Sequence, residues 1–386
     1  MHAAVRADSI DALREIAKRR LPRPVFDFID GGADDEITLR ANSEDLREVE
    51  LLPRYLRDVA ARDTAVDILG ASAELPLIMA PTGLAALGWP KADILLARAA
   101  ARRRIPFVIS TSSSVRMEEI AAAAKGARLW FQVYIYKDRD LVRSLIDRAA
   151  GCGIEALVLT VDAPVLGWRR RDHANKFTVP LRPTLKMAVE LARCWRWTLD
   201  IAVSGVPKMQ NFVERGRGND VGSLAHLMTS NMDATVSWRE LAWLRKMWPG
   251  KLVLKGLCSA LDAAEALQHG VDAIWVSNHG GRQLDGAPST ISQLPAIIDA
   301  VGSCAEVFVD GGVRKGGDIV KAVALGARAT AVGRATLFGV SAGGQAGADQ
   351  AVTILGNEFD RCLALIGAPS ATQIDRSFVR IPSSWN

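Results

Sequence analysis

The chain has 386 residues, of which 49% are hydrophobic and 24% are charged, as is typical of a globular protein with a sizeable core. The net charge of +5 comes from short basic clusters without interleaved aromatic residues, which argues against a nucleic-acid partner. Five dispersed cysteines and five dispersed histidines offer no metal-binding spacing, and the cysteines predict reduced thiols in a cytoplasmic protein.

Residues 1–70 are predicted to form a helical cover that packs on the main domain. Residues 8–20 have the pattern of an amphipathic helix with Ser9 as its N-cap, and two prolines end it just afterwards. A second helix is predicted from about Asp34 to Leu46.

From residue 75 onwards, short apolar runs alternate with alanine-rich helical stretches. We predict eight strands, at residues 75–80, 107–110, 129–134, 156–161, 252–255, 273–276, 307–309 and 329–332. Near-continuous apolar strands that alternate with helices indicate parallel pairing with both faces covered. Eight such units predict an α/β fold, a closed (β/α)₈ or TIM barrel. A doubly wound open sheet is the alternative, but the G-x-G-x-x-G motif is missing after the first strand.

Polar side chains follow nearly every predicted strand, where a barrel places its reactive groups. In chain order they are Thr82 and Gly83, Ser110, Gln132 and Tyr134, Thr160 and Asp162, Lys255, Ser277 and His279, Asp310 with Gly311, Gly312 and Arg314, and Gly333 with Arg334. The glycines and arginines after the last two strands match the usual phosphate site of such barrels. We therefore expect a phosphorylated ligand there, and the polar residues after the other strands would line the rest of a large polar cofactor.

The stretch S-N-H-G-G-R-Q-L-D at residues 277–285 carries the most chemistry. His279 and Arg282 are three residues apart, so a helical turn starting here would place a base and an anion clamp on one face. The alternative is a capped turn with a structural histidine, but the polar residues are too many and too varied for a cap alone.

Residues 178–232 interrupt the alternation of strands and helices. An insertion of this length is typically a lid, a binding loop or a flexible segment. Its basic residues lie beside tryptophans such as Trp195 and Trp197, which suits peripheral contact with a membrane surface. We find no signal peptide and no run of about 18 apolar residues, so no spanning helix is expected.

These residues together resemble the family of FMN-dependent α-hydroxy-acid oxidases and dehydrogenases over nearly the whole chain. The stretches that carry the resemblance are residues 21–33, 80–83, 131–134, 159–162, 255–256, 277–285 and 310–314. Within the family, Gly83, residues 88–91 and residues 232–234 are most similar to the membrane-associated (S)-mandelate dehydrogenases.

The resemblance implies roles for the catalytic residues. His279 would take the proton from the substrate, and Asp162 would hold the resulting imidazolium. Arg169 and Arg282 would bind the substrate carboxylate, and Tyr134 would hydrogen-bond its hydroxyl or carboxylate group. Oxidation at Cα needs such a base, such positive charge and an electron sink, so the chemistry of the residues agrees with the resemblance.

The resemblance also implies FMN as the cofactor. Lys255 would lie at the N1/C2 carbonyl region of the flavin and favour its reduced, anionic form. The cofactor-binding residues would be Thr82, Gly83, Ser110, Gln132, Thr160, Lys255, Ser277, Asp310, Gly311, Gly312, Arg314, Gly333 and Arg334. No metal ligands are expected.

The chain departs from the family pattern at three positions near the expected site. Phe28 stands where most members have a tyrosine that helps to bind the carboxylate, and losing one hydrogen bond to a charged group costs about 1.5–3 kcal/mol. Gly83 replaces the alanine of the oxidases, which favours a dehydrogenase. Ser112 replaces a bulky tryptophan, which leaves room for a larger substrate.

The expected activity is oxidation of an (S)-2-hydroxy acid, aromatic and mandelate-like, with electrons passed to a quinone or another carrier. One alternative is an oxidase for lactate or for medium or long 2-hydroxy acids that uses oxygen and releases hydrogen peroxide. Another is an FMN- or phosphate-binding barrel that has become an isomerase, a lyase or a sensor, for which Phe28 is the sole support.

The expected organisation is a single domain over residues 1–386. Residues 75–177 and 233–340 would form the barrel, residues 178–232 the insertion, and residues 341–386 a C-terminal helix and tail. The resemblance implies a homotetramer in the cytoplasm, with peripheral contact to the cytoplasmic face of the inner membrane through the insertion.

Overall fold

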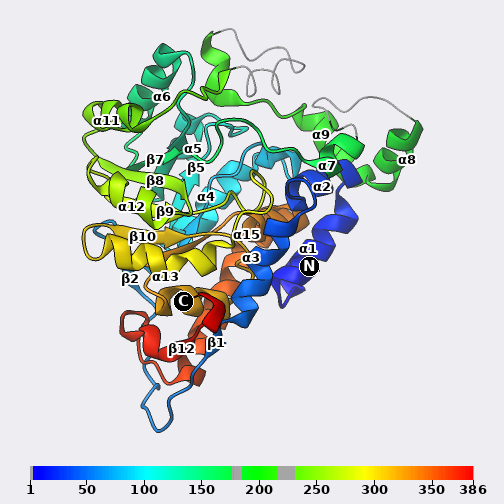
Figure 1. The fold of residues 1–386 in the computed structure, drawn as a ribbon. Coiled ribbons are helices and arrows are strands. Elements are labelled where there is room, and N and C mark those ends of the chain that lie inside the picture. Colours follow the sequence, from blue (N-terminus) through cyan, green and yellow to red (C-terminus); the bar gives the residue numbers. More distant parts are fainter. Residues whose placement is uncertain (1–2, 176, 178–184, 216–230, 386) are drawn as a thin grey trace.

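The computed structural model describes residues 3–175, 177, 185–215 and 231–385. A closed barrel of parallel strands forms its centre (Figure 1). In their order around the barrel, the strands are β10 (Glu306–Val309), β11 (Ala329–Val332), β4 (Leu77–Met79), β5 (Pro106–Ile109), β6 (Arg128–Val133), β7 (Ala156–Thr160), β8 (Lys251–Leu257) and β9 (Ala273–Val276). All eight predicted strands are confirmed, and with them the TIM-barrel fold.

Helices cover the outside of the barrel, because each strand is followed by at least one helix before the next strand begins. These helices are α4 (Ala92–Arg102), α5 (Met117–Ala123), α6 (Arg139–Gly151), α7 (Arg170–Ala174), α11 (Trp238–Met247), α12 (Ala260–Leu267), α13 (Thr290–Val301), α14 (Gly316–Ala324) and α15 (Arg334–Ile366). Helix α15 is broken at Gly343 and Gly344, whose backbone angles are not helical.

The N-terminal residues form η1 (Ala3–Arg6) and the helices α1 (Ile10–Arg20), α2 (Arg23–Asp30) and α3 (Ile37–Glu48). Ser9 caps α1 as predicted, since its hydroxyl oxygen accepts a hydrogen bond from the Ala12 N–H group at 3.2 Å. Helix α3 begins three residues later than predicted, because Asp34 and Glu36 adopt left-handed backbone conformations. Helix α1 packs on α15, and α2 reaches the end of the barrel where the strands point.

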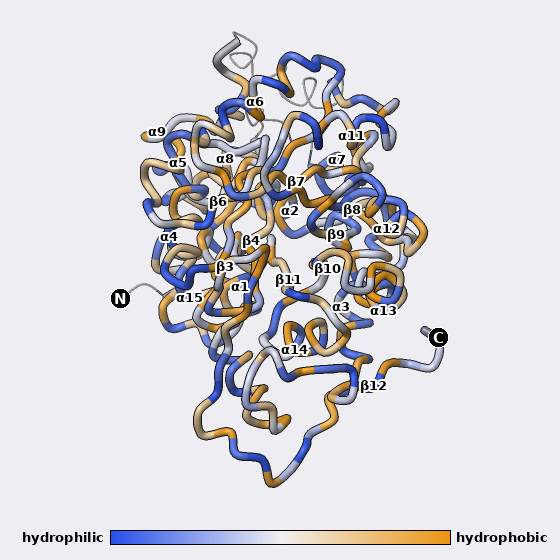
Figure 2. The backbone as a smooth tube through the Cα atoms, turned by 90° about the vertical axis from the view of Figure 1, so that its left-hand side faces the viewer, coloured by the Kyte–Doolittle hydropathy of each residue, from blue (hydrophilic) through white to orange (hydrophobic). Residues whose placement is uncertain are grey.

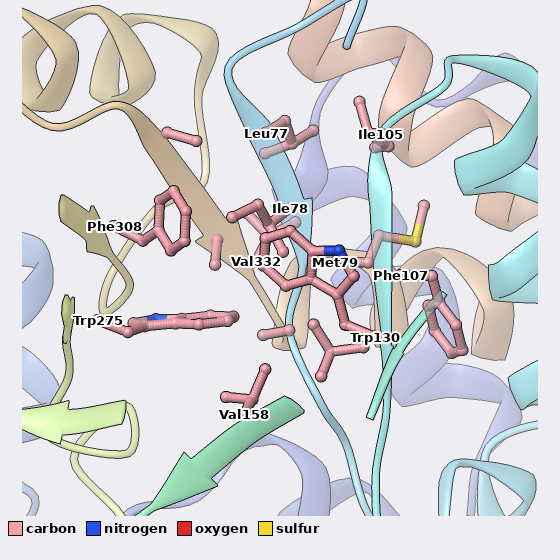
Figure 3. Packing of buried hydrophobic residues seen from close by; sticks show 14 of the residues in the cluster. Leu77, Ile78, Met79, Ile105, Phe107, Trp130, Val158, Trp275, Phe308 and Val332 are labelled. Atoms are coloured by element: carbon pink, nitrogen blue, oxygen red, sulfur yellow. The ribbon is translucent and has the colours of Figure 1, made fainter. Parts of the chain in front are cut away.

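The interior of the barrel is filled by large apolar side chains. The Trp130 and Trp275 rings are completely buried and lie 5.7 and 6.1 Å from the Phe308 ring (Figure 3). The backbone trace is mostly hydrophobic along these central strands and alternates in hydropathy along the surrounding helices (Figure 2). This closed core makes the barrel a rigid frame for the groups at its rim.

Outside the barrel, β1 (Glu50–Leu51) pairs with β12 (Val379–Arg380), and β2 (Val66–Ile68) pairs with β3 (Ala71–Ala73). Short 3₁₀ helices are η2 (Ala85–Leu87), η4 (Ala371–Gln373), η5 (Arg376–Phe378) and η6 (Ser383–Trp385). All five cysteines are free thiols.

The described part of the insertion contains α8 (Leu185–Arg193), α9 (Trp195–Ser204) and η3 (Gln210–Arg215). The predicted flexibility of residues 178–184 and 216–230 concerns positions outside the described residues. No helix among the described residues has the length and apolar character needed to cross a membrane.

Candidate active site

A cavity of about 630 Å³ lies at the C-terminal ends of the barrel strands. The predicted site residues that line it are Phe28, Thr82, Gly83, Ser110, Gln132, Tyr134, Thr160, Arg169, Lys255, His279, Arg282, Asp310, Gly311, Gly312, Arg314, Gly333 and Arg334. Asp162 and Ser277 contact lining residues from behind. The structure thus brings together residues that are up to 306 positions apart in the sequence, because the strands end at one rim.

His279 lies after β9 with its imidazole ring against Asp162, which follows β7. The distance from His279 Nδ1 to Asp162 Oδ1 is 2.9 Å. Burial is the largest influence on the pKa of Asp162 and raises it, but His279 and Lys255 together hold it below its ordinary value. The ionised carboxylate selects the tautomer with a proton on Nδ1, which leaves Nε2 as the basic atom.

The helical turn expected at His279 is absent. His279, Gly280 and Gly281 have φ angles of 58°, 66° and 72°, so the chain makes a left-handed turn that a helix cannot contain. A side chain at position 281 would place Cβ 2.6 Å from the backbone nitrogen of Leu39 in α3, so glycine is required there. The expected base and clamp still reach one cavity, by way of this tight turn.

Lys255 on β8 is held by groups on or just after the next two strands, β9 and β10. Its Nζ atom donates a hydrogen bond to Ser277 Oγ at 2.7 Å and lies 3.1 Å from Asp310 Oδ2. The Ser277 hydroxyl in turn donates to Asp310 Oδ1 at 2.8 Å, and the indole N–H group of Trp275 donates to Oδ2 at 3.0 Å. The carboxylate of Asp310 therefore has partners on both oxygens and fixes the ammonium group at the cavity wall.

Two guanidinium groups lie near the ring of Phe28. The Cζ atoms of Arg282 and Arg169 lie 5.3 and 6.0 Å from the ring centroid. Arg282 Nη1 donates hydrogen bonds to the carbonyl oxygens of Phe28 at 2.9 Å and Gly31 at 2.8 Å, which fixes the guanidinium group against the C-terminal end of α2. Burial lowers the pKa of both arginines, so the pair would gain from an anionic ligand.

Tyr134 lies beside this cationic pair. Burial, followed by the charge of Asp162, raises the pKa of its hydroxyl group far above the ordinary value. The phenol therefore keeps its proton at every physiological pH and acts in the cavity as a hydrogen-bond donor.

The opposite end of the cavity carries Arg314 and Arg334. Arg334 donates hydrogen bonds to the carbonyl oxygens of Ile29, Gly31 and Gly280 at 2.8–3.1 Å, and burial lowers its pKa to about 9. Burial also lowers the pKa of Arg314. The charge of the Asp30 carboxylate raises the pKa of both arginines but does not offset the effect of burial. Two buried cations at one end of the cavity fit the dianionic phosphate group that the sequence predicted.

Gly311 and Gly312 are required by the packing of α3 against the rim as well as by the expected ligand. Their φ angles are 104° and 82°, and a Cβ atom at Gly311 would lie 2.6 Å from Thr290 Oγ1. A Cβ atom at Gly312 would collide with the backbone of Asn42 in α3. These glycines thus allow α3 to pack close to the rim as well as leaving room for a ligand.

Several lining residues have no counterpart in the sequence-based prediction. Among them are Ala163, Leu166, Asp172, Phe177 and Met209. Phe177 stacks on Phe28 with ring centroids 5.0 Å apart, and Met209 comes from the insertion. No motif surrounds these residues, and their positions depend on loops whose course is set by distant contacts.

The fold, the cavity and its residues define an oxidoreductase with a cofactor bound at the rim of the barrel. The model of the FMN-dependent dehydrogenase family matches residues 17–381, and the chain belongs to this family.

Similar proteins cover almost the full length of the chain. (S)-mandelate dehydrogenase from Pseudomonas putida is 40% identical over 96% of this chain and 93% of its own length. L-lactate dehydrogenase from Pseudomonas syringae pv. syringae is 38% identical over 95% and 96%. The crystal structure of the monotopic membrane protein (S)-mandelate dehydrogenase superimposes with a TM-score of 0.94 at 39% identity, covering 97% of this chain and 100% of that one.

FMN, the cofactor of this family, fits the groups that line the cavity. Gln132 Nε2 and Thr160 Oγ1 are buried at its wall and have no hydrogen-bond partner among the described residues. Buried polar atoms of this kind normally have partners, and the heteroatoms of a flavin ring would supply them. The cationic Arg314 and Arg334 would hold the phosphate group, and Lys255 would lie against the ring system.

Proposed function

We propose that the protein oxidises an (S)-2-hydroxy acid with an aromatic side chain to the 2-oxo acid and passes the electrons to a quinone or another carrier. The observation that carries this proposal is the convergence of one oriented base, His279, with two cations, Arg169 and Arg282, in one cavity. A 2-hydroxy acid offers a carboxylate for the cations and a removable proton next to it.

In this proposal each residue has a defined task. Arg169 and Arg282 bind the carboxylate, and the hydroxyl group of Tyr134 donates a hydrogen bond to the substrate. His279 accepts the proton at Nε2, and Asp162 stabilises the imidazolium through Nδ1. The bound FMN supplies the acceptor for the two electrons.

Two features of the cavity support an aromatic substrate. The cavity has apolar walls formed by Phe177, Leu166 and Met209, beside the small Ser112. At Gly83 an added Cβ atom would lie 3.0 Å from Ser112 Cβ, so this wall stays open through glycine. Two of the similar proteins are an (S)-mandelate dehydrogenase and an L-lactate dehydrogenase, which makes lactate the substrate to compare.

The test is an anaerobic titration of the FMN-loaded protein with (S)-mandelate and with L-lactate, followed by admission of air. Much faster bleaching by mandelate and slow reoxidation in air would support the proposal. Fast reoxidation with hydrogen peroxide would identify an oxidase instead, and a mandelate oxidase is among the similar structures. No bleaching by either acid would refute 2-hydroxy-acid oxidation.

We also propose that the surface of α8 and α9 rests on an anionic membrane. On α9, Trp195, Leu199 and Val203 are 59%, 57% and 81% exposed, and Arg196 adjoins them. The two helices project from one corner of the molecule (Figure 1). Exposed apolar side chains with neighbouring arginines suit the interface of a bilayer. A similar solved structure is that of a monotopic membrane protein.

Co-sedimentation with phosphatidylglycerol vesicles tests this surface. Leu199→Glu combined with Val203→Glu should abolish sedimentation with the vesicles. Leu261→Glu is the matched control, because Leu261 is 84% exposed on α12 at the other side of the molecule (Figure 1). Equal sedimentation of the double variant and the control would refute membrane binding through α8 and α9.

The remaining expectations concern the whole assembly. We propose that residues 1–386 act as one domain, in a homotetramer at the cytoplasmic face of the inner membrane. Light scattering on the purified protein measures the assembly, and a monomeric mass would refute it.

A further inference from the structure

The residues Met209–Phe212, here named the anchor segment, bring the insertion back to the barrel. Asn211 is 1% exposed, and its Oδ1 atom accepts a hydrogen bond from the Met117 N–H group at 3.0 Å. Its Nδ2 atom donates to the carbonyl oxygens of Ser110 at 3.3 Å and Thr111 at 3.5 Å. One buried amide thus ties the insertion to both ends of the loop between β5 and α5.

Backbone groups of the anchor segment add to this attachment. The Gln210 N–H group donates to the Ser113 carbonyl oxygen at 3.0 Å, and Arg148 Nη1 donates to the Asn211 carbonyl oxygen at 2.9 Å. The Phe212 ring packs on Tyr136 with centroids 5.6 Å apart. Because so many contacts meet within four residues, the segment has one defined position.

Met209 is the residue of this segment that lines the cavity, and it is 6% exposed. Its position follows from the neighbouring contacts, since Tyr136 packs on Tyr134 with ring centroids 6.2 Å apart and Tyr134 lines the cavity. The loop after β5 and the residues after β6 therefore hold Met209 in place.

The place of Met209 in the barrel separates it from the phosphate end. Arg314 and Arg334 follow β10 and β11, and in the strand order β6 and β7 stand across the barrel from these two strands. The anchor segment is attached after β5 and β6, and Tyr134, Leu166 and Phe177, which line the same cavity, follow β6 and β7. We therefore expect Met209 to face the side chain of the proposed substrate.

We propose that Met209 is a specificity-determining residue that contacts the side chain of the 2-hydroxy acid, and that Asn211 is its positioning residue. This inference rests on the proposed function and names the residue of the cavity wall that selects the substrate. A thioether chain is flexible and polarisable and packs well on an aromatic ring. The methyl group of lactate offers too little surface to gain from the same contact.

The test compares (S)-mandelate with L-lactate in the FMN-loaded protein. Met209→Ala should lower kcat/KM for mandelate about tenfold, mainly through KM, and change kcat/KM for lactate less than twofold. The mandelate-to-lactate preference therefore falls about tenfold. Met209→Leu conserves the volume and should keep the preference within about threefold of wild type.

Met232→Ala is the matched control for loss of a buried methionine. Met232 is also 6% exposed and its backbone pairs with Tyr136, but it is not among the described residues that line the cavity. This variant should keep the wild-type preference. If the wild-type protein oxidises mandelate and Met209→Ala keeps the wild-type preference, the role of Met209 is refuted while the proposed function stands.

Asn211→Ala should lower the preference in the same direction, because Met209 loses its fixed position. The double variant Met209→Ala/Asn211→Ala should show no lower preference than Met209→Ala, since both changes remove the same contact, that of the Met209 side chain with the substrate. Additive losses, or a wild-type preference with reduced thermal stability in Asn211→Ala, would overturn the positioning role. A wild type that oxidises neither acid would overturn the proposed function and this inference together.

Discussion

Phe28 places an aromatic ring without a hydroxyl group near both guanidinium groups of the proposed carboxylate clamp. Phe28→Tyr should lower KM for the 2-hydroxy acid roughly tenfold, because one hydrogen bond to a charged group contributes about 1.5–3 kcal/mol. Steady-state kinetics measure this change. The methyl ester of the substrate is the control, since it has no carboxylate charge and should gain little. An unchanged KM for the acid would place the ring away from the carboxylate.

Asp93 shows how burial alters a residue outside the cavity. Its side chain is 2% exposed at the start of α4, and burial raises the pKa from 3.8 to about 6, against hydrogen bonds from Ser113 and Ser114. Because the folded protein binds this proton more tightly than the unfolded chain, the contribution of Asp93 to stability falls as pH rises from about 4 to about 6.

Asp93→Asn removes this pH dependence because an amide does not ionise. The free energy of unfolding of the variant, relative to wild type, should increase by up to about 3 kcal/mol between pH 4 and pH 7. Denaturant unfolding at both pH values measures the difference, in which the other titrating groups cancel. A difference that is independent of pH would contradict the shifted pKa.

At the scale of elements, the barrel strands could be predicted because their signal is local. Strand β9 is a continuous apolar run that ends at a polar residue, and the closed barrel buries all four of its residues. The left-handed turn at His279 could not be predicted, because Gly281 is required there by the approach of α3, some 240 residues earlier in the sequence. The place of Met209 in the cavity wall could not be predicted for a similar reason, since residues about 100 positions earlier in the sequence hold the neighbouring Asn211.

Helix α9 is attached by its one buried tryptophan as well as by the Arg20–Asp200 ion pair. The indole N–H group of Trp197 donates a hydrogen bond to the Leu87 carbonyl oxygen at 2.7 Å. Trp197→Phe removes this bond at a cost of about 1 kcal/mol, so the helix should open locally about fivefold more often.

Limited trypsin digestion measures this opening at Arg193 and Arg196. Cleavage there should be about fivefold faster in Trp197→Phe, provided that the helix opens and closes much faster than trypsin cleaves, so that the rate follows the population of the open form. Trp195→Phe is the matched control, because Trp195 is exposed and its loss should leave the rate unchanged. Equal rates in the two variants would show that Trp197 does not hold the helix.

At the scale of the whole molecule, folding gathers positive charge at one rim of the barrel. Burial is the largest cause of the lowered pKa of Arg282 and Arg334, and other arginines of the site lower both further. Their position after the strands could be predicted, but their mutual repulsion depends on how the closed barrel brings their ends together. Such a site is less stable alone than with an anionic ligand.

The phosphate group of FMN should therefore stabilise the whole fold. At an FMN concentration about 100-fold above its Kd, the protein gains about 2.7 kcal/mol, which raises Tm by about 3 °C for a chain of this length. Riboflavin at the same concentration has no phosphate and should raise Tm by less than about 1 °C. In Arg334→Gln the advantage of FMN over riboflavin should shrink, because one phosphate-binding cation is lost. Equal shifts of Tm for the two flavins in the wild type would contradict a phosphate site at Arg314 and Arg334.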